Sequence, residues 1–145
     1  MSNLTDILEG IETILKDNVT GAKAYPYPPD AVNHTPAVLI LPTEEPFEDP
    51  EQAFGGNTFK LTVLLTVLVA SGDPESGWKQ LMNMLDPTAA GTSVIKALRD
   101  NPTLNSTADS SGVTAVRNVG RKLYGEPPTS FFGADLVLEV YKSVA

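Results

Sequence analysis

The side chains of this chain that could do chemistry are few, and most of them lie in one short stretch. Carboxylates crowd the segment between residues 44 and 51, which contains Glu44, Glu45, Glu48, Asp49 and Glu51. Carboxylate oxygens are the ligands that Ca²⁺ prefers. The spacing does not match a calcium-binding loop, and prolines and Phe47 interrupt the ligand set. We therefore interpret the stretch as a solvated, self-repelling loop, with a Mg²⁺- or Ca²⁺-dependent enzyme or ligand-binding site as the alternative.

The sequence offers few side chains for catalysis by a thiol or an imidazole. The sequence has no cysteine, which excludes disulfides and thiolate metal sites, and it has one histidine. That residue, His34, precedes Thr35-Pro36 and is predicted to be a surface turn residue. Phosphate-binding loops, nucleophile elbows and dinucleotide fingerprints are not found. The sequence therefore predicts no catalytic residue, no cofactor and no metal.

The formal net charge of −8 argues against nucleic-acid binding as the main function. It is compatible with DNA in transit, because a repelling wall is what a non-adhesive channel needs. Arg117, Arg121 and Lys122 form the basic cluster of the sequence. On one regular strand, Arg117 and Arg121 share a face and Lys122 points away. We interpret the three as partners for nearby acids, including those of a neighbouring subunit, in preference to phosphate ligands.

The elements expected to position these residues follow from hydrophobic periodicity. An amphipathic helix is predicted from Leu4 to about Asn18, and an extended piece at 22–25. Strands are predicted at 36–42 and 59–70, with a long loop or excursion at 43–57 between them. Helices are expected from Pro74 to Leu85, capped by Asp73, and over 89–100. A loop at 103–112 precedes strands at 113–124 and 131–144.

This order predicts one α+β domain over residues 1–145. We expect an antiparallel or mixed sheet, with the N-terminal helix and the two central helices on one face and a C-terminal β-hairpin. Trp78, Met82 and Leu85 are expected to belong to the core. The sequence shows no signal peptide and no apolar run long enough to span a bilayer as a helix, which predicts a soluble intracellular protein with no membrane partner.

The run Phe59–Ala70 is too apolar for a strand with one solvent-exposed face. Alternate side chains of a strand point to opposite faces. One row is wholly apolar and suits the domain core. The other row is mostly apolar after its start and needs another cover, from this chain or from another copy of it. Its candidate subunit-interface residues are Thr62, Leu64, Thr66 and Leu68.

The order and spacing of several segments resemble the tail terminator proteins of long-tailed, non-contractile phages of actinobacterial hosts. After the N-terminal helix, these segments are Tyr25-Pro26-Tyr27-Pro28-Pro29-Asp30, Pro36 to Ile40, the Phe59 strand, Leu85-Asp86-Pro87, Ile95 to Leu98, Asn101 to Leu104, Val113 to Gly120 and Phe132 to Leu136. The resemblance covers nearly the whole chain. The long excursion at 43–57 and the enlarged turn at 125–128 depart from the pattern.

This resemblance implies a non-enzymatic virion protein. Such proteins form a ring, typically a hexamer, that caps the finished tail tube, stops its polymerisation and docks the head-side connector, while DNA passes through the lumen. The implied partners are copies of the chain, the tail tube protein and the connector or stopper protein. The implied location is the tail–neck junction of the virion, and the host cytoplasm during assembly. A head-completion or stopper protein of the neck is the nearest alternative. We expect the acidic residues of 44–51 to face the lumen or the tube.

Overall fold

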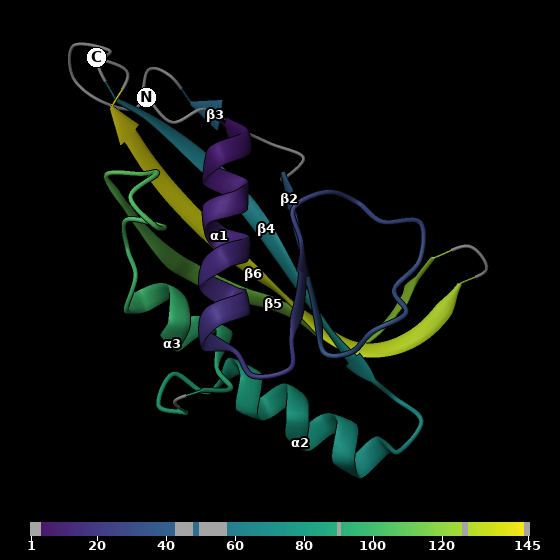
Figure 1. Ribbon diagram of the computed structural model, residues 1–145. Coiled ribbons are helices and arrows are strands. Elements are labelled where there is room, and N and C mark those ends of the chain that lie inside the picture. The colour runs from purple at the N-terminus through teal and green to yellow at the C-terminus, as the bar shows by residue number, and fades with distance from the viewer. Residues whose placement is uncertain (1–3, 43–47, 50–57, 90, 126–127, 144–145) are drawn as a thin grey trace.

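The computed structural model describes residues 4–42, 48–49, 58–89, 91–125 and 128–143. Figure 1 shows the helices packed beside a long twisted sheet. In chain order the elements are α1 (Leu4–Asn18), β1 (Lys23–Tyr25), β2 (Ala37–Pro42), β3 (Glu48–Asp49), β4 (Thr58–Ala70), α2 (Pro74–Leu85), α3 (Val94–Arg99), β5 (Ser110–Tyr124) and β6 (Thr129–Ser143).

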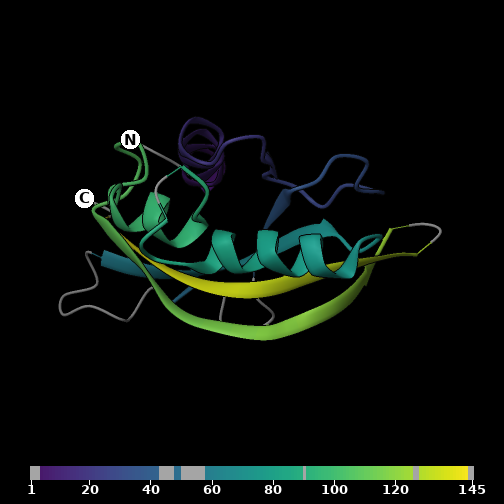
Figure 2. The same ribbon diagram turned by 90° about the horizontal axis from the view of Figure 1, so that it is seen from below.

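The strands form one mixed sheet in the order β1-β2-β4-β6-β5, with β3 also paired to β4. β1 runs parallel to β2, and the remaining pairs are antiparallel. β5 and β6 form the expected C-terminal hairpin. Figure 2 shows α1, α2 and α3 on one side of the curved sheet. The predicted α+β class and the placement of the helices on one face are confirmed.

The core lies between the helices and one face of the sheet. Alternate residues of β4, from Leu61 to Val69, and of β6, from Phe132 to Val140, point into it. They meet the apolar stripe of α1, which includes Ile7, Ile11 and Leu15. Period-2 strands and a period-3.6 helix therefore bury their apolar sides against each other, as the sequence predicts.

The orientation of α2 differs from the prediction. Asp73 caps the helix, as expected, and its carboxylate accepts a hydrogen bond from the Ser76 amide. The helix packs through Gly77, where a Cβ would collide with the Ala70 carbonyl oxygen. Each residue turns an α-helix by about 100°. Trp78 and Met82 therefore lie on the flank of α2 and not on the side that faces the sheet, with 41% and 37% of their surface exposed. The expectation that both belong to the core is wrong.

The predicted helix over 89–100 is a single short helix, α3, that begins at Val94. The Ser93 hydroxyl accepts a hydrogen bond from the Lys96 amide and fixes this start. β5 begins at Ser110, three residues before its predicted start. None of the helices in the described part of the chain is long and apolar enough to cross a membrane.

Candidate functional site

The sheet face that carries no helix holds the predicted interface residues. Thr62, Leu64 and Thr66 of β4 point to this second face and are half-buried. Leu68 is 1% exposed and belongs to a second apolar cluster, with Tyr25, Ala37, Leu39 and Phe131. Leu68 therefore has no surface to offer to another subunit, whereas the other three remain partly accessible.

The chain itself covers Leu68. Val32, from the proline-rich segment 26–36, packs against the second cluster, as does Tyr124 of β5. The Tyr124 hydroxyl donates a hydrogen bond to the Pro29 carbonyl oxygen, which ties the segment to the hairpin. Burial, followed by the nearby charge of Asp30, raises the pKa of the Tyr124 phenol. The hydroxyl therefore stays protonated, and able to donate, at neutral pH.

Tyr124→Phe should loosen segment 26–36. Loss of one hydrogen bond costs about 1 kcal/mol, and hydrogen exchange in residues 26–36 should accelerate about fivefold. Mass-spectrometric hydrogen exchange measures this directly. Tyr27→Phe, at a side chain that is 57% exposed, is the matched control and should leave exchange unchanged. Equal exchange in the Tyr124→Phe variant and the wild type would contradict this role for the hydroxyl.

Farther along the same face, a buried carboxylate collects three hydrogen-bonding partners. Asp135 of β6 is 8% exposed. Its Oδ1 accepts a hydrogen bond from Thr66 Oγ1 at 3.0 Å and lies 3.1 Å from Lys122 Nζ. Its Oδ2 accepts one from Asn118 Nδ2 at 2.9 Å. Burial by itself would raise the pKa of Asp135, but these hydrogen bonds and the Lys122 charge hold the pKa below its usual value.

Asp135→Asn should therefore destabilise the fold in a pH-dependent way. A lowered folded-state pKa means that the ionised carboxylate stabilises the protein above its ordinary pKa near 4, and that this contribution disappears as the pH falls through the folded value. We expect a loss of about 2 kcal/mol at pH 7 and a smaller loss at pH 3, measured by urea unfolding. The exposed Glu75→Gln change should cost almost nothing at either pH. An equal loss for Asp135→Asn at both pH values would contradict the assignment.

The basic cluster is split between the two faces of the sheet. Arg117 pairs in register with Asp135, and Arg121 pairs with Phe132, which points into the core. The expectation that Arg117 and Arg121 share a face is therefore wrong. The physical reason is the register shift between Arg117 and Gly120, where a bulge changes the alternation. The expectation of acidic partners is confirmed for Lys122, which pairs with Asp135 of its own chain.

The outer strand of the sheet carries the clearest surface feature. β5 is the last strand in the sheet order, so its outer edge has no strand beside it in the described part of the chain. Figures 1 and 2 show the last part of β5 and the first part of β6 extending beyond α2. Apolar side chains are exposed along β5 and the adjoining flank of α2: Trp78 41%, Met82 37%, Val116 42%, Val119 45% and Leu123 73%.

A stacked cluster joins α2 to this outer strand. The rings of Trp78 and Phe132 meet edge to face with centroids 5.7 Å apart. The Arg121 guanidinium lies 4.7 Å from the centre of the Phe132 ring, within range of a cation–π interaction. We call the exposed set, which flanks the edge strand on both faces of the sheet, the β5 surface; it is defined as Trp78, Met82, Val116, Arg117, Val119, Arg121 and Leu123. Sequence reasoning missed it, although the closely spaced apolar and basic residues of Val116–Leu123, interrupted by Asn118 and Gly120, were the available signal.

The acidic stretch is described only in part. Glu48 and Asp49 form β3 and pair through the backbone with Leu61 and Lys60 of β4, while Glu44, Glu45 and Glu51 lie outside the described residues. His34 is exposed, and its Nε2 lies 2.8 Å from the Gly21 carbonyl oxygen, in keeping with a turn residue. Among the described residues, no group of three or more histidine, aspartate or glutamate side chains could hold a metal ion.

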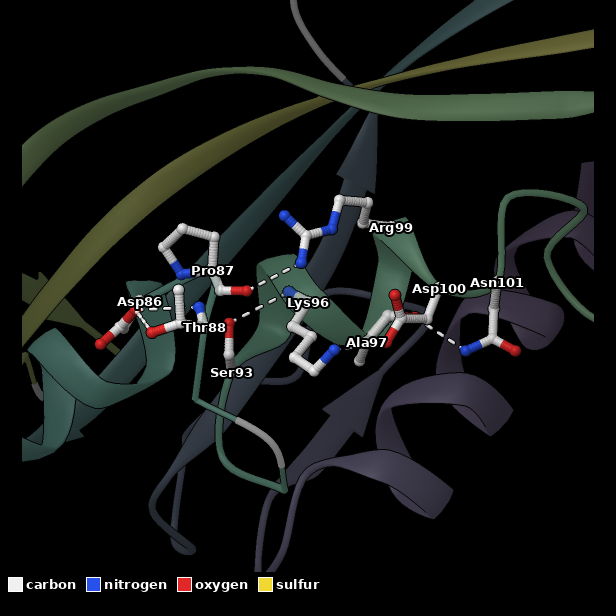
Figure 3. A network of polar contacts seen from close by, with 9 residues as sticks. All are labelled: Asp86, Pro87, Thr88, Ser93, Lys96, Ala97, Arg99, Asp100 and Asn101. Atoms are coloured by element: carbon white, nitrogen blue, oxygen red, sulfur yellow. Dashed lines mark hydrogen bonds and ion pairs between the residues drawn. The ribbon is translucent and has the colours of Figure 1, made fainter.

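A polar network around α3, shown in Figure 3, is structural. The Arg99 guanidinium donates to the Pro87 carbonyl oxygen, and Lys96 pairs with Asp100 at 2.9 Å. Hydrogen bonds from Thr88 lower the pKa of Asp86, and the bond from Lys96 lowers that of Asp100. Both carboxyls are therefore ionised and already hydrogen-bonded at neutral pH. This arrangement secures the ends of the helix and leaves no group poised for proton transfer.

No protein-family model matches this chain, and no curated protein matches its sequence.

Proposed function

We propose that this chain is a structural virion protein of a long-tailed phage. In this proposal, copies of the chain form a ring, a hexamer, that caps the tail tube, ends its polymerisation and docks the tail to the head-side connector. The ring acts at the tail–neck junction and leaves a lumen for DNA. Copies of the chain, the tail tube protein and the connector are its partners, and it performs no catalysis.

The β5 surface is the observation that supports assembly. A 15-residue strand whose outer edge has no neighbour among the described residues is a template for pairing with another chain. Here the strand exposes two valines and a leucine, and the exposed Trp78 of α2 is linked to the strand through Phe132 and Arg121. Isolated proteins seldom expose such residues together without a binding role. Assembly therefore has a contact surface that the sequence did not predict. The proposed assembly does not depend only on Thr62, Leu64 and Thr66 on the sheet face that carries no helix.

The order of the sequence segments supports a role in the phage tail, and the net charge supports a lumen through which DNA passes. A net charge of −8 would repel DNA from the wall of a channel. In this proposal the acidic residues of 44–51 contribute to that wall.

Capping of tail tubes tests the function. Tail tube protein is polymerised with and without the purified chain, and tubes are examined by negative-stain electron microscopy. The proposal expects shorter tubes with a ring at one end. Gln80→Asp, an exposed change on the far flank of α2, should cap as well as the wild type. Tubes of unchanged length without end density would contradict the proposal, and binding to the head-side connector alone would identify a stopper protein instead.

A further inference from the structure

A closed ring needs two different patches on each subunit. Head-to-tail contacts join one patch to another and close by rotation, whereas a self-complementary patch gives a two-fold dimer. The β5 surface supplies one patch at one edge of the sheet. The sheet order puts β1 at the opposite edge, and α1 packs over β1 and β2. We infer, on the basis of the proposed function, that the β5 surface docks onto the α1–β1 edge of a second copy of this chain.

The charges of the two edges are complementary. β5 carries Arg117, Arg121 and Lys122 and no acidic residue. Lys122 is paired with Asp135 of its own chain, so the two arginines leave a formal charge of +2. α1 carries Asp6, Glu9, Glu12 and Asp17 against Lys16, a formal charge of −3. The exposed Lys23 of β1 brings the formal charge of the α1–β1 edge to −2. Opposite charges steer two such surfaces together and fix their pairing. A symmetric contact of β5 with β5 would instead bring two basic strands together.

The charged groups that this docking uses are accessible. Arg117 is exposed, and within the described residues its guanidinium has no carboxylate partner. On α1, Glu9 and Asp17 are exposed and Glu12 is half-buried, and in the described part of the chain none of the three forms an ion pair. These groups can therefore pair across a contact without breaking an ion pair within the subunit.

The α1–β1 edge also has room for a protruding side chain. A hollow of about 260 Å³ lies between α1 and β1, lined by Glu12, Lys16, Ala22, Lys23 and Ala24. The two alanines give it an apolar part, Glu12 gives it a carboxylate, and Lys16 and Lys23 give it two amines. Leu123, which is 73% exposed, is the side chain of the β5 surface that matches the apolar part of the hollow.

Charge reversal on each edge tests the docking. One variant carries Arg117→Glu with Arg121→Glu, and the other carries Glu9→Lys with Glu12→Lys. In a head-to-tail ring each variant repels itself, but an alternating ring of the two has an attractive pairing at every contact. Sedimentation velocity, alone and with short tail tubes, should show that association of each variant is at least about tenfold weaker. An equimolar mixture should recover the association of the wild type.

Several controls separate the possible failures. Lys79→Glu, at an exposed α2 side chain, should assemble like the wild type. Arg117→Glu alone spares the stacking of Arg121 on Phe132 and should still weaken association if the double variant misfolds. The docking would be overturned if the Glu9→Lys, Glu12→Lys variant assembled normally, or if mixing the two folded variants restored no association. Either result would leave the proposal of a ring standing. A wild type that neither self-associates nor caps tubes would overturn the proposed function itself.

Discussion

Replacing Gly133 with alanine should destabilise the folded chain by about 3 kcal/mol, because the surrounding atoms leave no space for an added Cβ. It would collide with the backbone carbonyl oxygen of Val67 and would lie 2.8 Å from Lys122 Cδ and 3.1 Å from Leu68 Cδ2. The carbonyl belongs to the centre of the sheet and cannot yield. The lysine stem could move only by withdrawing its amine from Asp135, 3.1 Å away. The change therefore damages the sheet and the Asp135 cluster together.

Urea unfolding measures this loss, and the neighbouring strand provides a control. Gly112 lies in β5, and a Cβ there would meet no atom within 4 Å. Gly112→Ala should change the free energy of unfolding by less than about 0.5 kcal/mol. If both variants unfolded at the same urea concentration, the close packing of Lys122 over Gly133 would be refuted.

Leu123→Asp should abolish self-association and leave the fold intact. The side chain is 73% exposed, so little apolar contact within the subunit is lost. In the proposed docking the same position packs against the apolar part of the hollow on the next subunit, where the loss of hydration of a carboxylate costs several kcal/mol. A penalty of that size weakens association by a hundredfold or more, on the order of 3 kcal/mol. Sedimentation velocity of the purified variant reports the change in association, and a thermal melt confirms that the fold is retained.

Gln80→Asp is the matched control for this change. It introduces the same charge at an exposed position, two residues and thus about 200° around the helix from Trp78. This variant should associate like the wild type. If Leu123→Asp and Gln80→Asp associated equally well, the β5 surface would have no part in assembly.

The sequence predicts those parts of the fold whose signals are local. α1 follows from its apolar spacing, α2 begins where Asp73 and Pro74 favour a helix start, and the alternation over Ala134–Val140 matches the buried row of β6. The start of α3 depends on a serine cap that periodicity does not reveal. Whether the sheet was antiparallel or mixed stayed open, because strand order is decided by contacts between distant segments.

The candidate site was harder to predict because tertiary contacts create it. Asp135 is bonded to Thr66, 69 positions away, and to Asn118, 17 positions away. The bulge after Arg117 reverses the alternation on which the face assignment of Arg121 depended. Gly77 sets the rotation of α2 and thereby exposes Trp78. Each of these features depends on a contact between particular residues in the folded chain, and hydrophobic periodicity does not predict such contacts.

The mass of the assembled protein tests the central claim most directly. Sedimentation velocity of the wild-type chain over a concentration series, alone and with short tail tubes as templates, distinguishes one chain of 15.4 kDa from a closed multiple of it. We predict a discrete species of several chains, near six times that mass, that forms free or at tube ends. A protein that sediments as a single chain at every concentration and leaves the tubes unbound would contradict the claim that this chain is built to assemble.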